Sequence, residues 1–532
     1  MTKPEPEIGR GDSSATEDEA RADPRAWVGL AVVTAASMLI AMDNTVLFLS
    51  LPQITADLNA SGPQMLWIQD IYGFLVAGLL ITMGTVGDRI GRKRLLMIGA
   101  AAFGAASLMA AYSASAEMLI AARGILGIAG AALVPTILGL VSGLFVNPKE
   151  RTRAIAVLMT CFTLGGALGP LVGGALLENY WWGAVFIIAV PVMALMLLVT
   201  PLLLDGPTTT LPGKLDLPSV GLSLVSILPI TFGFKELASD GLSWPVVVGV
   251  VAGTGFTVLF VRRQYRLESP LLDLRLFRNR TFSVSLGALL LGQFAIGGML
   301  LLLPQYFQLV LGQTPLRAGL WLLPGTVVFA LTAMLIPTIA AKVRRDRLLA
   351  GTLFVAAAGY VQLALVGPGS GHWRLVIGMV VVLAGMAPLV LLVTDLAVSS
   401  APPERAGAAA AMSSTSTEFG IALGVAALGS VLTAVYTRVL SPMPAGVPEA
   451  DAAAARESLA RASNVAGALP DPASGELLTV AREAFVTGFN AVGVISAVVA
   501  IGAAITVKVL LRNGSERTDH ADSATRREES LT

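Results

Sequence analysis

The chain contains little of what metal, redox or nucleotide chemistry requires. Among its 532 residues there is one cysteine, Cys161, and there are two histidines, His372 and His520. A single cysteine excludes an intramolecular disulfide, and the histidines fall in a predicted loop and a predicted tail, so neither suits a proton relay. There is also no P-loop, no HExxH and no GxSxG in a strand–turn–helix setting. We therefore expect no enzyme, no catalytic or metal site, no cofactor and no self-contained ATP-driven pump.

Charged residues are also scarce. Asp, Glu, Lys and Arg make up 13% of the chain, hydrophobic residues make up 55%, and the net charge is +1. With a mean hydropathy of +0.75, such a chain does not fold as a soluble globule, which predicts a polytopic protein of the lipid bilayer. The balanced charge and the lack of basic tracts argue against nucleic acid as a partner. Residues 1–26 are polar and acidic without the pattern of a signal peptide, so we expect a disordered cytoplasmic tail.

Long apolar runs are what the sequence does contain. Stretches of about 18–25 apolar residues recur about fourteen times, which predicts an all-α protein with about 14 transmembrane helices. Lys and Arg gather in alternate short loops, with clusters at 89–94, 149–153, 262–280 and 342–347. The opposite short loops hold only Arg317 and Arg374. By the positive-inside rule, this asymmetry predicts that both termini are cytoplasmic.

An internal repeat is visible in two of the basic loops. GTVGDRIGRKRLL at 84–96 is echoed by PTIAAKVRRDRLL at 337–349. Two related halves are typical of a parallel-repeat transporter, although short basic loops are common in membrane proteins and chance is the alternative. Because eight predicted helices separate the two loops, two helices look inserted between two six-helix bundles. The expected segments are a tail (1–26), a first bundle (27–204), a linker (205–217), two inserted transmembrane helices (218–261), a cytoplasmic linker (262–281), a second bundle (282–511) with a long outer loop (436–479), and a cytoplasmic tail (512–532).

Four motifs resemble the major facilitator superfamily and, within it, the fourteen-span drug:proton antiporters of the EmrB/QacA type. They are GTVGDRIGRKR at 84–94, LIAARGILGIAGAALVP at 119–135, GGALGPLVGG at 165–174 and AMDNTVLFLSLP at 41–52. The resemblance covers residues 27–511 and implies the major facilitator fold, with two six-helix bundles plus two inserted helices. The first motif bears on the fold, whereas the third resembles a signature largely confined to exporters.

The resemblance also assigns structural roles to two of these motifs. The loop is similar to a cytoplasmic latch that ties the two bundles together in the outward-open state, although topogenic charge also explains its basic residues. The latch residues are Gly84, Asp88, Arg89, Gly91 and Arg92.

The third motif is similar to the antiporter helix, with Gly165, Gly169, Pro170, Gly173 and Gly174. Three of its glycines recur every four residues and share one helix face, where backbones can approach closely. The resemblance implies that this helix packs on the tenth span and seals the outer side. Ordinary small-residue packing is the alternative.

Acids within the predicted spans are the candidates for chemistry, because a carboxylate there costs roughly 2.5–3.5 kcal/mol. Asp43 lies in the fourth motif, and the resemblance implicates it in proton coupling or cation binding. A structural ion pair with Arg123, the buried arginine of the second motif, is the alternative. Asp70 shares a helix face with Trp67 and Phe74. Aromatic faces beside an acid suit an organic cation, although Asp70 could instead be an interfacial residue at the outer end of its span.

Glu418 is the third acid and lies in MSSTSTEFGIALG at 412–424. This stretch resembles the branch of the family that exports quaternary ammonium and dye-like cations. Many relatives carry a second glutamate where this chain has Ser414, which makes a preference for dications less secure. We expect Glu418 to bind a cation or a proton, with a hydrogen-bonded structural acid as the alternative.

These residues predict a proton-coupled antiporter that exports lipophilic cations, dyes or antibiotics by alternating access, with the proton gradient as its energy source. The expected partners are small hydrophobic or cationic molecules, protons and lipid, and the expected form is a monomer in a bacterial cytoplasmic membrane. A dedicated self-resistance exporter of an endogenous antibiotic or metabolite is the alternative, since an Ala-, Gly-, Val- and Arg-rich composition suits a high-GC bacterium. A non-transporting receptor or an uptake symporter would also fit the fold.

Overall fold

The computed structural model describes residues 23–145, 147–203, 216, 218–226, 229, 244–267, 274–402, 406–441, 443–444 and 447–529. At a few of these positions, Asp88 among them, and beyond Leu510, it describes the backbone only. Every regular element in these ranges is a helix. The predicted N-terminal tail lies outside the described residues up to position 22, and so does the linker except for Asp216.

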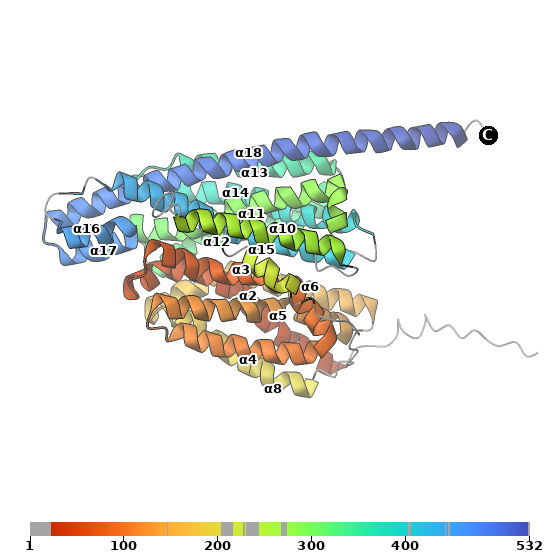
Figure 1. Ribbon diagram of the computed structural model, residues 1–532, viewed down its shortest axis with the longest axis horizontal. Coiled ribbons are helices and arrows are strands. Elements are labelled where there is room, and N and C mark those ends of the chain that lie inside the picture. Colours follow the sequence, from red (N-terminus) through yellow and green to blue (C-terminus); the bar gives the residue numbers. More distant parts are fainter. Residues whose placement is uncertain are drawn as a thin grey trace, which may run out of the picture.

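The N-terminal helices form one bundle, shown in red to yellow in the lower part of Figure 1. They are α2 (Pro24–Asp57), α3 (Gly62–Ile90), α4 (Arg92–Ala111), α5 (Ala116–Leu144), α6 (Pro148–Asn179), α7 (Ala184–Ile187) and α8 (Ala189–Leu203). Sequence signals mark several starts: Ser61 and Gln64 form a capping box before α3, and the Asn147 side chain caps α6. Such helices satisfy their own backbone groups, which is what a bilayer requires.

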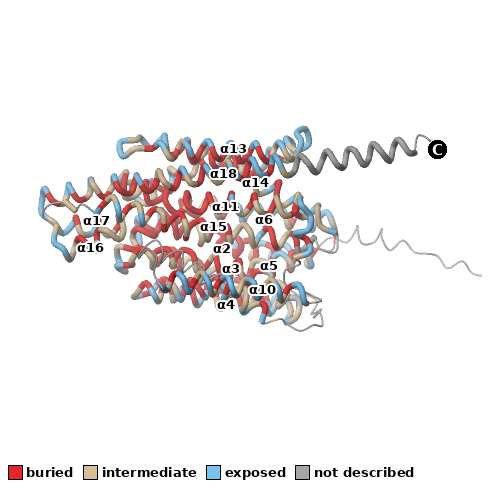
Figure 2. Tube along the Cα trace, turned by 45° about the horizontal axis from the view of Figure 1, so that its top comes forward, coloured by how far each residue is buried: buried red, intermediate tan, exposed pale blue. Residues whose placement is uncertain are grey.

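The C-terminal helices form a second bundle, green to blue in Figure 1. They are α11 (Arg280–Gln305), continued by the π-helix η2 (Tyr306–Val310), then α12 (Pro315–Ala340), α13 (Arg345–Ala364), α14 (His372–Ser399), α15 (Ala406–Val439) and α18 (Ala473–Glu529). Figure 2 shows buried positions concentrated along α2, α11 and α15 in the middle of the molecule. Buried apolar side chains also fill the interior of each bundle, so one hydrophobic core runs through both.

A helical segment at 218–226 and α10 (Trp244–Arg266) lie between the bundles in sequence, followed by the short 3₁₀ helix η1 (Leu274–Arg278). Asp216 and Arg263 clamp their ends together, with Nη2 of Arg263 2.6 Å from Oδ1 of Asp216. Burial tends to raise the pKa of Asp216, but hydrogen bonds from Arg263 and Ser219 outweigh it and hold that pKa below its usual value. The 218–226 segment also contacts α3, since a Cβ at Gly78 would lie 2.9 Å from a methyl of Leu224.

Twelve helices of the described part are long and apolar enough to cross a membrane. This count does not reach the fourteen spans predicted from the sequence. Neither α3 nor the segment at 218–226 is among the twelve.

The predicted outer loop carries its own helices. Both α15, which continues to Val439, and α18, which begins at Ala473, extend into the segment predicted as an outer loop at 436–479. Because a helix can continue beyond the membrane, these predicted bounds of the outer segment stay a prediction. Between α15 and α18, the helices α16 (Glu449–Glu457) and α17 (Leu459–Ala468) stand at one end of the bundles (Figure 1). Tyr436 of α15 donates a hydrogen bond to the carbonyl of Ala455 (3.0 Å), and Asn464 donates to the carbonyl of Ala56 on α2 (3.4 Å). This hairpin is packed on the bundles rather than free in solvent.

The two bundles meet along a seam made by α6 with α12 and by α3 with α15. At the first contact, a Cβ added to Gly319 would lie 2.3 Å from the carbonyl oxygen of Pro170. At the second, a Cβ on Gly73 would lie 3.3 Å from that of Ala422. Gln308 Nε2 also donates to the carbonyl of Leu49 on α2 at 2.8 Å. These contacts lie in the part of the bundles toward α16 and α17, and the molecule is closed at that end.

Candidate functional site

Asp43 and Arg123 form a buried ion pair inside the first bundle. Nη1 of Arg123 on α5 lies 2.6 Å from Oδ2 of Asp43 on α2, and their side chains are 0% and 5% exposed. The pairing left open as an alternative by the sequence is therefore present. Breaking such a pair leaves an uncompensated buried charge, which costs about 3–5 kcal/mol. Whether Asp43 also exchanges protons stays a prediction.

Arg123 makes two further contacts, both with α3. Its Nε donates a hydrogen bond to the carbonyl of Ile68 at 3.3 Å. Its guanidinium carbon lies 4.5 Å from the centre of the Tyr72 ring, in cation–π geometry. Sequence reasoning missed Tyr72. A usable signal was the glycine row of the second motif, because Gly127 and Gly130 leave the space that Tyr72 fills.

The acid and the two aromatic residues of α3 differ in burial. Asp70 is 1% exposed, and whether it lies at interfacial depth or takes part in transport stays a prediction. Phe74 is also buried and packs edge-on against Phe419 of α15, with ring centres 6.2 Å apart. Trp67 is only partly buried. Phe74 thus helps to join the bundles, and an aromatic contact of Trp67 and Phe74 with substrate stays a prediction.

Glu418 lies on the seam and retains some exposure. It is partly exposed on α15, and Ser414, one turn earlier on the same face, is exposed. Within the described part of the chain no basic group forms an ion pair with Glu418. The charges of Asp43, Glu418 and Arg123 all lie close enough to act electrostatically on the Tyr72 hydroxyl. The structure thus brings together two predicted carboxylates, one of which is already neutralised.

The predicted latch makes its described contacts within the first bundle. Gly91 has φ of +94°, which favours glycine, and it forms the turn between α3 and α4. Next to it, Arg92 donates to the carbonyl of Gly139 on α5 (2.7 Å) and Lys93 to that of Pro201 on α8 (3.2 Å). Gly84 lies beside α5, Arg89 is partly buried, and the side chain of Asp88 is outside the description. A link from this loop to the second bundle stays a prediction.

The antiporter helix α6 uses two faces. A Cβ on Gly165 would lie 2.0 Å from the carbonyl oxygen of Met38, and one on Gly169 1.9 Å from Oγ1 of Thr45, both on α2. Gly173 likewise faces α2, at Val46. These three glycines therefore pack on α2, and the expected packing of this helix on the tenth span is made by other residues of the motif.

The residues that do meet the tenth span, α12, are the other two of the motif. A Cβ on Gly174 would lie 2.7 Å from Cα of Leu316, and the carbonyl of Pro170 lies against Gly319. Helical periodicity explains the division, because the residues at 170 and 174 face about 100° away from those at 169 and 173. Helix α6 thus approaches the second bundle closely, through the face that carries Pro170 and Gly174 and not through the face that carries Gly165, Gly169 and Gly173.

Comparison with known proteins identifies the family. A sequence model of the Major Facilitator Superfamily matches residues 33–425. The chain belongs to the Major Facilitator Superfamily. It is 40% identical over 497 residues to the multidrug efflux pump LfrA of Mycolicibacterium smegmatis, covering 93% of this chain and 98% of LfrA. It is 32% identical over 464 residues to the methyl viologen resistance protein SmvA of Salmonella typhimurium, covering 87% of this chain and 93% of SmvA.

A solved structure agrees with the superfamily fold. A bacterial homologue of the human lysosomal transporter Spinster, in an inward-facing and unoccupied conformation, matches with a TM-score of 0.62. The match covers 92% of this chain and 99% of that chain at 18% identity, so it bears on the fold alone. The superfamily and these relatives are transporters, which agrees at a coarse level with the expectation that the chain is no enzyme.

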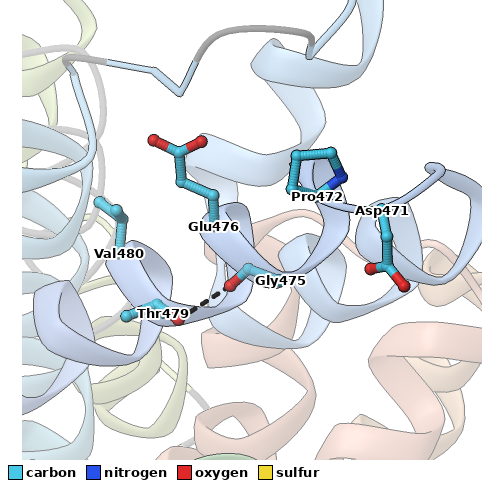
Figure 3. A pocket seen from close by; sticks show the side chains of 6 residues that line it. All are labelled: Asp471, Pro472, Gly475, Glu476, Thr479 and Val480. Atoms are coloured by element: carbon cyan, nitrogen blue, oxygen red, sulfur yellow. Dashed lines mark hydrogen bonds between the residues drawn. The ribbon is translucent and has the colours of Figure 1, made fainter.

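An open crevice at the start of α18 lies apart from the carboxylates of this superfamily member. It is lined by Asp471, Pro472, Gly475, Glu476, Thr479 and Val480. Figure 3 shows the two carboxylates pointing in different directions, while Thr479 donates to the carbonyl of Gly475 at 2.8 Å. The acids therefore do not converge on one ligand. Within the described residues, no three His, Cys, Asp or Glu side chains gather as a metal site.

Proposed function

We propose that this protein is a proton-coupled antiporter that exports lipophilic cations and related hydrophobic drugs. The observation that carries this proposal is Glu418, a partly exposed acid on the seam, beside a second acid, Asp43, that Arg123 neutralises. The kinship with a multidrug efflux pump and a methyl viologen resistance protein supports the same direction of transport and the same class of substrate. The whole molecule is then a multi-pass membrane transporter that binds small molecules.

The two acids have different tasks in this mechanism. Glu418 takes either a proton or the cationic substrate, because one carboxylate cannot hold both in a confined site. Asp43 stays ionised on Arg123 while the site is loaded, so the first bundle carries no net charge there. Movement of one charge across about 100 mV is worth roughly 2.3 kcal/mol. Exchange of one proton on Glu418 for a monocation moves no net charge and would use the pH gradient alone, whereas exchange of two protons would need a second exchanging acid and would also use the membrane potential.

The orientation of the molecule in the membrane decides from which side the site is loaded. The positive-inside rule makes the end that carries the basic loops cytoplasmic, so α16 and α17 face the outside and both termini face the cytoplasm. With this orientation, the contacts of Gly174 and Pro170 with α12 lie on the outer side of the seam, and the proposal takes Ser414 and Glu418 to be loaded from the cytoplasm in this conformation. Rocking of the bundles would then open the site outward. The bacterial cytoplasmic membrane is the proposed location and a monomer the proposed form.

Fourteen spans remain part of the proposal, as in the EmrB/QacA type. The support is that α3 and the helical segment at 218–226 add two helices to the twelve counted by length and composition. Because the chain has one cysteine, a Cys161→Ser background allows single cysteines to be placed in each loop. Labelling from outside should then alternate along fourteen spans. Labelling at 241 from the same side as at 214 would limit the inserted region to a re-entrant pair.

Dye transport in proteoliposomes tests the function. With an imposed pH gradient, we expect the wild type to move ethidium uphill against the direction of proton flow. Asp43→Asn and Glu418→Gln should abolish this uphill transport, while Glu476→Gln, which changes an exposed acid of α18, should leave it intact. A wild type that moves no dye, but collapses a pH gradient when a cell-derived metabolite is added, would replace multidrug export by dedicated export.

A further inference from the structure

Arg123 is held by fewer groups than a buried guanidinium can use. Among the described residues it is the only basic side chain in the fully buried class, at 0% exposure. Asp43 accepts from Nη1 and the carbonyl of Ile68 accepts from Nε, whereas Nη2 has no hydrogen-bond partner among the described residues. The remaining stabilisation comes from the Tyr72 ring, whose centre is 4.5 Å from the guanidinium carbon. A desolvated cation is attracted to an aromatic face more strongly than an exposed one.

The helix that carries Arg123 is also shaped to seat this ring. A Cβ on Gly127 would lie 2.8 Å from the carbonyl oxygen of Tyr72, and one on Gly130 would lie 2.8 Å from its hydroxyl. Gly127 and Gly130 thus leave α5 without side chains at the two positions where the backbone and the ring of Tyr72 contact it. Tyr72 is 2% exposed. Gly127, which makes room for Tyr72, follows Arg123 by one turn of α5, so the ring is held next to the guanidinium that it contacts.

One helix, α3, lies between Arg123 and the helix that carries Glu418. It packs on α5, where Asp43 holds the guanidinium at 2.6 Å, and also on α15 of the second bundle. The Tyr72 ring and the carbonyl of Ile68 both belong to α3, so the groups that contact Arg123 from this side are part of the first bundle. The attraction of the ring therefore adds to that of Asp43 and keeps the guanidinium in the first bundle.

We infer that Tyr72 is a positioning residue for coupling, whose aromatic face keeps Arg123 on Asp43 and so leaves Glu418 to substrate and protons. This inference rests on the proposed proton-coupled export. A guanidinium that is held less firmly would leave Asp43 open to protons in the absence of drug. Protons would then cross without substrate, and the number of drug molecules moved per proton would fall.

The electron density of the ring face can be changed with little change in shape. Tyr72→Phe keeps the face, and Tyr72→4-fluorophenylalanine, Tyr72→3,5-difluorophenylalanine and Tyr72→3,4,5-trifluorophenylalanine weaken it stepwise. The control series is the same at Tyr360 of α13, another fully buried tyrosine. No basic side chain lies over the Tyr360 ring in the described part of the chain. For each variant, uphill ethidium transport under a pH gradient is compared with ethidium counterflow without a gradient.

The expected result is a split between the two assays. Tyr72→Phe should stay within about twofold of the wild type, and uphill transport should then fall with each fluorine, by about tenfold over the series. Counterflow should stay within about twofold, since Glu418 and the seam are untouched, and drug-independent proton leak should rise. The Tyr360 series should be flat in both assays. Tyr72→Leu, which removes the face altogether, should show the largest leak.

Two results would overturn the inference without touching the proposed function. Uphill transport that is equal in all fluorinated variants means that the ring only fills space. Counterflow that falls in parallel with uphill transport means that the ring supports the fold and not the coupling. A wild type without uphill dye transport would instead remove the proposed function and this inference together.

Discussion

An acidic side chain has different surroundings in the interior of the first bundle and on the seam between the bundles. In the interior, Asp43 is buried, paired with Arg123 at 2.6 Å and supported by the Tyr72 ring. On the seam, Glu418 is partly exposed and follows an exposed serine by one turn. A buried charge is tolerated where a partner neutralises it, and an unpaired acid is tolerated where water or a ligand can reach it. The interior therefore holds a neutralised charge pair, and the seam holds a partly exposed acid to which the proposed mechanism assigns exchange.

Breaking the interior pair should have the largest effect. Arg123→Met removes the guanidinium from Asp43 and should lower the free energy of unfolding by about 3–5 kcal/mol, because the carboxylate stays buried without a partner. Denaturant unfolding in detergent measures this. The control is Arg374→Met, which changes an exposed arginine on α14.

A double variant tests the same ion pair in the opposite direction. Asp43→Asn added to Arg123→Met should restore most of the lost stability, because replacing both members of a buried pair is often close to neutral. If Arg123→Met unfolds like the Arg374→Met control, the pair contributes little and the contrast with the seam is lost.

Crowding the seam should come next. Gly174→Ala places a methyl group 2.7 Å from Cα of Leu316, whereas Gly166→Ala on the same helix meets nothing within 4 Å. Overpacking costs about 1–3 kcal/mol, and here it would act against the outward-closed conformation. We expect uphill dye transport to fall in Gly174→Ala and to be unchanged in Gly166→Ala. Equal transport by the two variants would show that this contact is not needed for closure.

Removing the charge on the seam should act on affinity and leave stability alone. Glu418→Gln should weaken binding of a monocationic dye by about 1.5–3 kcal/mol, the usual worth of a contact with a charged group. A neutral hydrophobic drug should bind as before. Equilibrium binding in detergent measures both ligands, with Glu476→Gln as the control. An equal loss for the neutral drug would mean that Glu418 supports the structure of the site and does not recognise charge.

The smallest effect is expected at Ser414. Its exposed hydroxyl lies one turn from Glu418, and Ser414→Ala should cost about 0.5–1.5 kcal/mol of affinity for a substrate that carries a hydrogen-bonding group. Ser441→Ala, at an exposed position after α15, is the matched control in the same binding assay. Identical affinities for the two variants would place the substrate away from this face of α15.

Much of the fold was predictable because it depends on local features of the chain. Apolar runs long enough to cross a bilayer indicated an all-helical membrane protein, and the loop at 84–94 indicated the superfamily that the comparisons establish. Caps such as Ser61 with Gln64 are local features of the same kind, and the structure shows this pair at the start of α3. The ends of the helices around the outer loop were less predictable, since α15 continues to Val439 through the polar residues Thr437 and Arg438, where hydropathy already falls.

The candidate site was predicted residue by residue, but not as an arrangement. Asp43, Arg123 and Glu418 stood out because charge is costly in a span. Tyr72 did not stand out, since an aromatic residue in an apolar helix is unremarkable until a guanidinium is found over its face. The three glycines of α6 were correctly placed on one face, and α6 does pack on the tenth span, through Pro170 and Gly174. That the glycines themselves meet α2 was not predicted, because periodicity says which residues share a face and not which helix that face meets.

By itself, then, the sequence determined the membrane class, the positions of most helices, the superfamily and the short set of charged residues inside the spans. These follow from hydrophobicity, capping and motif spacing, all of which act over a few turns of one helix. Only the tertiary structure decided that Arg123 neutralises Asp43, 80 positions away, that Glu418 is left with access, and that Pro170 and Gly174 meet the second bundle. Those outcomes depend on which helix faces are brought together, and packing over the whole bundle sets that choice.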